Sequence, residues 1–368
     1  MKYITEYRDK ELAKKLVADI AKEARPDRNY RLMEFCGGHT HVISRYGLGG
    51  IFPKNLPPIR GPRRPGRGMP IGRIDSAIEL ALEHGVILCT YADTMRVPAS
   101  KGLSLMKAKA QGGDIRMIYS AADCLDIARA NPDKNVVFFA IGFETTTPAT
   151  AVVLKQAKAE GLKNFFVFCN HVLTPPAMRH ILKNQEKVQI EGFVGPAHVS
   201  TIIGSEPYET FAKDYSKPVV IAGFEPLDML QSILMLIRQI NRGEAEVENE
   251  FTRAVRPEGN MKAIRMMEEV FALRDSFEWR GLGSVPKSAL KLSDAYSDFD
   301  AEKHFNLVYR SVPDNKACEC GAILRGEKQP SDCRAFGTVC TPESPIGSCM
   351  VSSEGACAAY FTYGRHKR

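Results

Sequence analysis

Short apolar runs alternate with longer amphipathic stretches between about residue 30 and residue 240. Each apolar run ends in turn residues, which is typical of a buried strand, and the stretches between the runs carry apolar residues at helical spacing. The runs that predict strands are GVILCTYAD, DIRMIYS, NVVFFAIGFE, NFFVFCNH, IEGFVGPAH and PVVIAGFEP. This alternation predicts an α/β fold in which helices cover both faces of parallel sheets. We expect two small Rossmann-like sheets with a cleft between them.

The pattern changes after residue 241. The segment NRGEAEVENEFTRAVRPEGNMKAIRMMEEVFAL predicts charged amphipathic helices, and a loop-rich segment follows it. From Cys318 onward there is little periodicity and a high density of cysteine. We therefore expect an N-terminal helix with a first α/β domain in residues 1–120, a second α/β domain in 121–225, and a helical, loop-rich C-terminal region in 226–368.

Composition is that of an ordinary globular protein, with 44% hydrophobic and 25% charged residues among 368. The N-terminal stretch lacks the apolar core of a signal peptide, and no apolar stretch is long enough to cross a membrane. These features predict a cytoplasmic protein with no membrane association. Because cytoplasmic thiols are kept reduced, the ten cysteines are not expected to form structural disulfides.

The net charge of +7 is spread along the chain except for one basic block, IRGPRRPGRGMPIGR. A nucleic-acid site would need interleaved aromatic residues or a basic helix, and this block has neither. We therefore expect no nucleic-acid partner. The arginines of the block are Arg60, Arg63, Arg64, Arg67 and Arg73.

Polar residues follow the ends of several predicted strands, where ligands bind in open parallel sheets. These residues are Asp93, Glu144, Thr145, Thr146, Asn170, His171, His198 and Glu225. Cys36, in the segment CGGHTH, follows the apolar start YRLMEF and so joins the same edge. Capping explains the threonines after Glu144 about as well as anion binding does.

Cys36 precedes two glycines, and His39 and His41 follow shortly after. A thiolate beside imidazoles can be a nucleophile with histidine as its base, or a soft metal ligand. A tight strand-to-helix turn with a small buried cysteine explains the segment equally well, so the sequence leaves these alternatives open. Cysteines in apolar contexts, and the single tryptophan, are expected to be core residues: Cys89, Cys124, Cys169 and Trp279.

The C-terminal segment contains six cysteines separated by one, twelve, six, eight and seven residues. It is too poor in periodic apolar residues to build a core of its own, which suggests that a metal stabilises it. Zinc sites usually take cysteines in pairs two to four residues apart, whereas wider, irregular spacings suit an iron–sulfur cluster. Four ligands would leave two thiols, which could form a redox-active disulfide. Zinc, or cysteines without metal, remain alternatives.

Several motifs together resemble the HypD family of nickel–iron hydrogenase maturation factors. They are FCGGHTH, IGFETTTPAT, GFVGPAHVS, VIAGFEPLDML and the tail GSCMVSSEGACAAYFTYGR. The resemblance covers nearly the whole chain. It implies two α/β domains around a cleft and a cysteine-rich part with a [4Fe–4S] cluster. It also implies that the protein and its partner HypC form a redox-active scaffold on which an iron atom receives two cyanides and one carbon monoxide. HypE would deliver the cyanide, HypF would charge HypE, and the hydrogenase large subunit would receive the iron.

The resemblance also assigns residues. Cys36 would hold the iron at the cleft, with His39 close enough to assist. The tail resembles ferredoxin:thioredoxin reductase, in which a cluster lies against a reducible cysteine pair. On that basis the cluster ligands would be Cys320, Cys333, Cys340 and Cys357. The redox pair would be Cys318 and Cys349.

One segment departs from the family pattern. The family usually reads GPGCPVC where this chain reads GPRRPGR, so that Arg64 and Arg67 replace two cysteines. Guanidinium groups neither ligate metals nor undergo thiol chemistry. An error in the reading of this segment, a diverged relative with altered chemistry, and a variant in which Cys36 alone suffices are all compatible with the change. If the arginines are present, we expect weaker iron binding and greater dependence on HypC.

Two other functions remain. An iron–sulfur reductase of a partner's disulfide would share the cluster but would carry no cyanide or carbon monoxide on iron. A zinc-stabilised nucleic-acid binder would be colourless and would bind with strong salt dependence. The scaffold is the leading hypothesis, and it is an assembly function with redox activity rather than turnover of a small metabolite.

Overall fold

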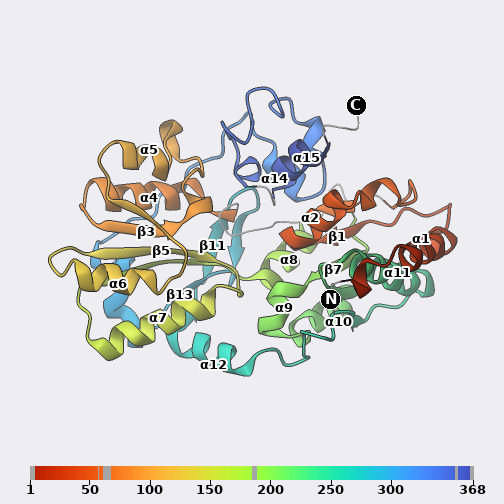
Figure 1. The fold of residues 1–368 in the computed structure, drawn as a ribbon, viewed down its shortest axis with the longest axis horizontal. Coiled ribbons are helices and arrows are strands. Elements are labelled where there is room, and N and C mark those ends of the chain that lie inside the picture. Colours follow the sequence, from red (N-terminus) through yellow and green to blue (C-terminus); the bar gives the residue numbers. More distant parts are fainter. Residues whose placement is uncertain (1–4, 57, 61–67, 185–188, 353–354, 365–368) are drawn as a thin grey trace.

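The computed structural model describes residues 5–56, 58–60, 68–184, 189–352 and 355–364. Two parallel sheets lie side by side, and a C-terminal segment that contains α14 (Cys320–Leu324) and α15 (Ala356–Gly364) lies above them in the view of Figure 1. The fold class expected from the sequence, α/β with two parallel sheets, is confirmed.

The four-stranded sheet has the order β4-β3-β5-β6. Every residue of its two longest strands is buried, which explains why these segments are continuous apolar runs. Helices cover both faces: α4 and α5 pack on one, α6 and α7 on the other. The strands are β3 (Ile87–Tyr91), β4 (Ile115–Ile118), β5 (Val136–Gly142) and β6 (Phe165–His171). The helices are α4 (Ile71–Leu82), α5 (Leu105–Ala110), α6 (Asp123–Ala130) and α7 (Thr147–Glu160).

The five-stranded sheet has the order β2-β1-β7-β8-β9, and all its strands are parallel. Three helices, α1, α2 and α11, pack on one face, while the other face joins the core that it shares with the four-stranded sheet. The strands are β1 (Leu32–Glu34), β2 (Pro58–Arg60), β7 (Gly192–Pro196), β8 (Val219–Ala222) and β9 (Val247–Asn249). The helices are α1 (Lys10–Glu23), α2 (Gly37–Arg45) and α11 (Pro226–Arg242).

The chain divides its strands between the sheets differently from the expected boundaries. It starts the five-stranded sheet with β1 and β2, builds the whole four-stranded sheet, and then returns to add β7, β8 and β9. A boundary at residue 120 therefore falls between β4 and β5 of one sheet. A boundary at residue 225 separates the paired strands β8 and β9.

Further short elements connect these layers and close the fold. The other helices are α8 (Thr174–Lys183), α9 (Ala197–Ile203), α10 (Glu209–Tyr215), α12 (Met261–Val270), α13 (Ala301–His304), α14 (Cys320–Leu324) and α15 (Ala356–Gly364). Two antiparallel pairs are β10 (Phe271–Leu273) with β13 (Leu290–Leu292), and β11 (Ser276–Trp279) with β12 (Gly283–Pro286). Short 3₁₀ helices occupy Glu6–Arg8, Leu48–Gly50, Ala92–Thr94, Ser100–Gly102, Glu206–Tyr208, Asp294–Phe299, Pro330–Asp332 and Ser348–Met350.

The segment after residue 241 is only partly helical. The helix α12 forms as expected, but residues 247–249 form the edge strand β9, which pairs with β8, and residues 271–273 pair with β13. The charged residues of the segment gave no strand pattern. These strands form because a partner strand lies beside them, and strand pairing does not depend on local periodicity alone. Among the helices that the structure describes, none is long and apolar enough to span a bilayer.

Candidate functional site

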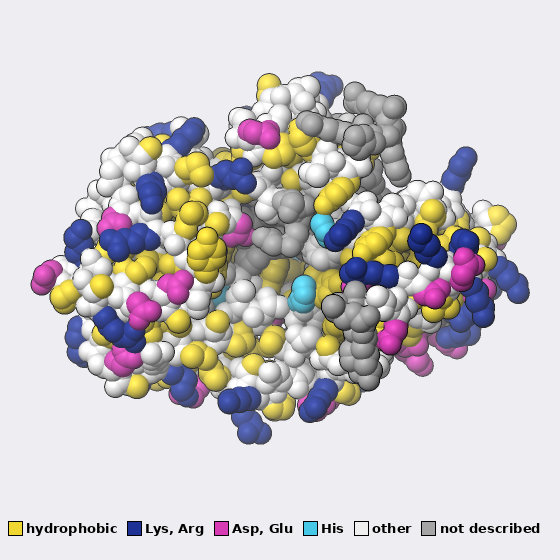
Figure 2. Space-filling view, in the orientation of Figure 1, with side chains coloured by type: hydrophobic (Ala, Val, Ile, Leu, Met, Phe, Trp, Pro, Cys, Tyr) yellow, Lys and Arg dark blue, Asp and Glu magenta, His cyan; other side chains and the backbone are white. Residues whose placement is uncertain are grey.

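The main cleft has a volume of about 830 Å³ and lies between the two sheets. In each sheet the strand that comes first in the sequence lies between two other strands. In the five-stranded sheet β1 lies between β2 and β7, and in the four-stranded sheet β3 lies between β4 and β5. Such switch points leave a crevice at the carboxyl ends of the strands. The two switch points face each other, and Figure 2 shows the surface hollowed between the two lobes. Polar or thiol-bearing residues of the lining are Cys36, Tyr91, Asp93, Tyr119, Thr145, Thr146 and His198.

Cys36 occupies the N-cap position of α2, two residues after the end of β1 at Glu34, and its side chain makes no capping hydrogen bond. Its backbone N–H donates to Oε2 of Glu34 at 3.3 Å, and the other oxygen of that buried carboxylate accepts from the hydroxyl of Thr40. The Glu34 carboxylate therefore ties the end of the strand to the first turn of the helix. The N-terminus of a helix favours negative charge, whereas the Glu34 carboxylate beside Cys36 disfavours it.

His198 is the imidazole that faces this thiol. Its Nδ1 lies 3.9 Å from Sγ of Cys36, and its ring stacks on Phe224 with the centroids 3.9 Å apart. A Cβ at Gly38 would lie 2.5 Å from Cε1 of Phe224, so only glycine leaves room for that ring. The second glycine of CGGHTH is thus explained by packing: it lets Phe224 support His198.

His39 occupies a different environment from the one the resemblance implies. It is fully buried, and its Nε2 donates to the carbonyl oxygen of Ala222 at 2.8 Å. It does not belong to the described lining of the cleft, whereas His198 does. Sequence reasoning gave His198 no preference over a structural role, because the proximity of residues so distant in sequence comes only from the pairing of β1 with β7.

The other polar residues at strand ends fall into two groups. Asp93, Thr145 and Thr146 line the cleft as expected. The remaining four have structural partners instead. Asn170 donates to the Phe168 carbonyl, His171 bonds Thr150, Glu225 pairs with Arg8, and Glu144 bonds Thr174. The threonine hydroxyls at 146 and 147 donate to the carbonyl of Phe143 and do not cap α7.

Glu144 is a buried carboxyl directly behind this edge of the cleft. The backbone N–H and the hydroxyl of Thr174 donate to its two oxygens at 2.7 and 2.9 Å. Burial raises the pKa of Glu144 to about 7, although both hydrogen bonds act in the opposite direction. This carboxyl can therefore exchange a proton near neutral pH.

Five of the six cysteines of the tail line one small cavity, although they come from separate turns of the chain. Those that line it are Cys318, Cys320, Cys333, Cys340 and Cys357. The sixth, Cys349, is fully buried and interacts with Cys320. The rest of the lining is mainly apolar, with Ile323, Ala335, Phe336, Ile346 and Met350. The expectation that these thiols share one site is thus consistent with their positions.

The residues present fit a cluster in the chemistry of their donors, because an iron–sulfur cluster is held by thiolates and five thiols line this cavity. Additional close contacts support the same arrangement. A Cβ at Gly347 would lie 2.2 Å from Sγ of Cys318 and 2.7 Å from Sγ of Cys320, and the N–H of Ile346 points to Sγ of Cys340 at 3.4 Å. In the described ranges no three His, Cys, Asp or Glu side chains are grouped tightly enough for a metal ion.

The thiols of the tail influence each other's ionisation. A hydrogen bond from Cys320 lowers the pKa of Cys318. Contacts with Cys318, Cys349 and Cys357, together with burial, raise the pKa of Cys320 well above its ordinary value. Cys318 is therefore the first of this pair to become a thiolate as pH rises.

A contact between two helices joins the tail to an element of the cleft. The helix α15, which carries Cys357, packs against α2, whose N-cap residue is Cys36. The hydroxyl of Tyr363 lies 3.4 Å from Nδ1 of His41, and the two rings meet edge to face. The two thiol sites are thus placed on directly contacting elements.

The cysteines outside these two sites are core residues, as the sequence predicts. Cys89, Cys124 and Cys169 are buried, and Trp279 is buried with its indole N–H donating to Ser288. Arg64 and Arg67, which replace the family's cysteines, lie outside the described residues.

Comparisons with known proteins identify the relatives of this chain. A family model described as the HypD "Hydrogenase formation hypA family" matches residues 11–364. A hydrogenase maturation factor HypD from Cupriavidus necator is 63% identical over 372 residues, covering 100% of this chain and 98% of that protein. The HypD of Azotobacter vinelandii is 60% identical over the same shares, and that of Escherichia coli is 43% identical over 99% of this chain and 98% of its own length.

Proposed function

The chain belongs to the HypD family of hydrogenase maturation factors, and from this premise we propose that it is the scaffold, together with HypC, on which iron receives two cyanides and one carbon monoxide. The observation that carries the proposal is the position of Cys36. Its thiol stands at the facing switch points of two sheets, in a cleft large enough for a ligated iron atom presented by a small partner protein. HypE would deliver cyanide there, after its charging by HypF, and the hydrogenase large subunit would receive the product.

Cys36 would hold the iron during assembly. A soft thiolate suits low-spin iron that carries strong-field ligands. A thiol must lose its proton before it binds a metal, and His198 Nδ1 at 3.9 Å is placed to accept that proton as the Sγ–Fe bond forms. We assign this role to His198 rather than to His39, whose Nε2 is engaged with Ala222.

The cysteine-rich tail would hold a [4Fe–4S] cluster through Cys320, Cys333, Cys340 and Cys357, with Cys318 and Cys349 as the redox pair. These four cysteines line the same cavity, and Cys318 and Cys349 both interact with Cys320. The cluster supplies electrons when bound. The contact between α15 and α2 makes the tail a neighbour of the cleft, so reduction of the pair could accompany assembly at Cys36.

Infrared spectroscopy tests the scaffold directly. The chain is co-expressed with HypC, HypE and HypF and purified with HypC without oxygen, and the spectrum is searched for cyanide and carbonyl stretches, which ordinary protein lacks. We expect these bands from the unaltered complex and their loss from Cys36→Ala. Cys124→Ala, which removes a buried thiol outside the cleft, is the matched control and should keep them. A complex with an intact cluster and no such bands would contradict the scaffold role.

The second candidate is an iron–sulfur reductase that acts on a partner's disulfide. The closeness of Cys318 and Cys349 to the other thiols favours it as an alternative use of the tail. Reduction of a partner's disulfide that persists in Cys36→Ala, from a chain that never shows cyanide or carbonyl bands, would support this function over the scaffold.

A further inference from the structure

A second cavity of about 400 Å³ lies outside the main cleft, where the start of α4 meets the β11–β12 hairpin and residues 309–311. The proposed function does not use it. The helix α4 begins in the sequence MPIGR, and the arginine of that sequence, Arg73, lines the cavity. The polar residues of the lining are Arg73, Ser276, Glu278, Ser284, Tyr309 and Ser311.

Arg73 is the charged residue at the base of this cavity. The exposed fraction of its side chain is 9%. Its guanidinium carbon lies 5.3, 5.3 and 5.1 Å from the ring centroids of Phe168, Phe277 and Tyr309. It also lies in the first turn of α4, where a positive charge is unfavourable to the helix dipole. Burying a guanidinium costs free energy unless acceptors satisfy its N–H groups.

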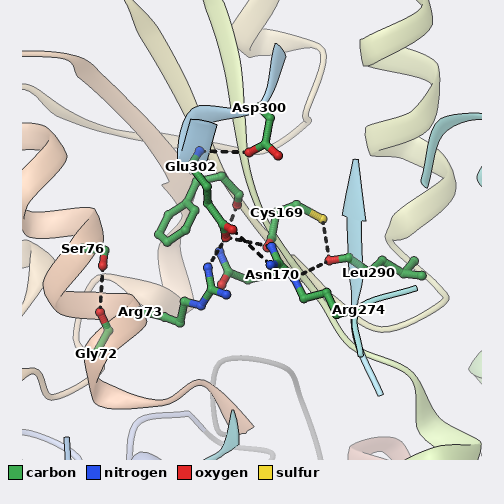
Figure 3. A network of polar contacts seen from close by, with 10 residues as sticks. Gly72, Arg73, Ser76, Cys169, Asn170, Arg274, Leu290, Asp300 and Glu302 are labelled. Carbon is green, nitrogen blue, oxygen red and sulfur yellow. Dashed lines mark hydrogen bonds and ion pairs between the residues drawn. The ribbon is translucent and has the colours of Figure 1, made fainter. Parts of the chain in front are cut away.

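Arg73 and Arg274 lie close together, and Arg274 takes most of the hydrogen-bond acceptors around them (Figure 3). Arg274 donates to both oxygens of Glu302 and to the carbonyls of Leu290 and Cys169, so its fork is well satisfied. Arg73 shares Glu302 through Nη1, and within the described part of the chain this is its one hydrogen-bonded acceptor. A guanidinium has five N–H donors, so Arg73 retains donors that no described group accepts from.

The positive charge around Arg73 also exceeds the negative charge that is paired with it. Two guanidiniums share the single carboxylate of Glu302, and Asp300 accepts from the backbone N–H of Glu302 instead of from a guanidinium. At the rim, Glu278 accepts a hydrogen bond from the hydroxyl of Tyr309. The cavity thus combines donors at its base with an anionic acceptor near its opening.

We propose that this cavity binds a small carboxylate ligand that also carries an amino group. The planar fork of Arg73 matches a carboxylate, and the ligand's amino group would face the carboxylate of Glu278. A doubly charged phosphate fits less well, because Glu278 would repel it. The volume lies within the range of small-molecule sites. The site is separate from the cleft and does not depend on the function proposed there.

Calorimetric titration of the full chain tests the proposal, with glycine as the amino carboxylate, acetate as a carboxylate without an amine, and inorganic phosphate. We expect glycine to bind saturably and more tightly than acetate. Arg73→Met should weaken both by about tenfold or more, the loss of a charge-assisted hydrogen bond. Glu302 keeps Arg274 in that variant, so the fold is expected to survive. Glu278→Gln should reduce glycine binding to the level of acetate.

Two further variants keep the test decisive. Ser311→Phe fills the opening of the cavity from an exposed position and should abolish binding even if Arg73→Met is poorly folded. Lys287→Met removes an exposed positive charge, paired with Asp275 beyond β12, and should leave affinity unchanged. The proposal is overturned if neither glycine nor acetate binds saturably, if Ser311→Phe and a folded Arg73→Met bind as the unaltered chain does, or if phosphate binds more tightly than acetate.

Discussion

The Sγ atom of Cys36 lies 3.9 Å from Nδ1 of His198, although 162 positions separate the two residues. Cys36 follows β1 and His198 follows β7, and these strands are parallel neighbours with Glu34 opposite Val194. Parallel pairing in this register brings both carboxyl ends to the same edge of the sheet. His198, the candidate proton acceptor of the Cys36 thiol, therefore comes from the neighbouring strand of the sheet and not from the CGGHTH segment.

Replacing His198 should slow the alkylation of the Cys36 thiol. The chain should stay folded, because His198 is exposed. We expect His198→Ala to reduce the rate at which iodoacetamide alkylates Cys36 near neutral pH by several-fold, since the imidazole no longer accepts the thiol proton. Mass spectrometry of the Cys36 peptide gives the rate. His180→Ala, which removes a partly buried imidazole bonded to the Leu282 carbonyl, is the control. Equal alkylation rates in all three proteins would remove His198 from this role.

Gly38→Ala should destabilise the site through Phe224. The new Cβ would meet the phenylalanine ring at 2.5 Å, and overpacking of this kind costs about 1–3 kcal/mol of unfolding free energy. Chemical denaturation measures the loss. Adding Phe224→Leu should recover part of the stability, because leucine leaves space for the methyl group. A single variant as stable as the unaltered chain would show that the ring moves without cost.

Glu144 should make the stability depend on pH. Its pKa is about 7 in the folded chain and near 4.5 when exposed, so the folded state holds this proton more tightly. The contribution is fully present below about pH 4.5 and is lost as pH rises through 7, by up to roughly 3 kcal/mol. Burial lowers the pKa of His171 to about 3, which acts with the opposite sign below pH 6.5.

For this reason the comparison with Glu144→Gln isolates the carboxyl. We expect the advantage of the unaltered chain over this variant to shrink between pH 5 and pH 7.5, as measured by denaturation at both values. A difference that is constant over the range would mean that Glu144 stays in one protonation state.

Gly347→Ala should impair the cysteine-rich tail. The backbone φ of Gly347 is −117°, which any residue adopts, so the effect comes from space alone: the Cβ would fall 2.2 Å from Sγ of Cys318. We expect less iron and a weaker visible absorbance after anaerobic purification. Ser344→Ala, at an exposed position nearby, should match the unaltered chain. Unchanged iron content in Gly347→Ala would place the cluster ligands elsewhere.

Restoring cysteine at positions 64 and 67 should strengthen iron binding. The paired change Arg64→Cys with Arg67→Cys recreates the family's GPGCPVC spacing, and thiolates ligate iron whereas guanidiniums do not. The infrared bands of the complex with HypC should become stronger. Lysine at both positions preserves the charge and is the control. Bands of equal strength in all three chains would show that Cys36 alone suffices.

The layers of this protein follow from local sequence patterns. Buried parallel strands such as Val136–Gly142 are continuous apolar runs, and their helices carry their own periodicity, so both are encoded locally. The motifs around Cys36 and in the tail likewise indicate the family to which the chain belongs, because each is a short run of particular residue types at fixed spacing. Local spacing and residue type are sufficient for these conclusions.

The contacts between distant residues are visible in the folded chain alone. The chain interrupts one sheet to build the other, so the strands that flank the cleft are distant in sequence and no continuous domain boundary describes them. That arrangement selected His198 instead of His39 for the cleft and gave Arg73 a buried position beside a second cavity. Strand pairing and burial depend on partners far along the chain, and local pattern carries no information about them.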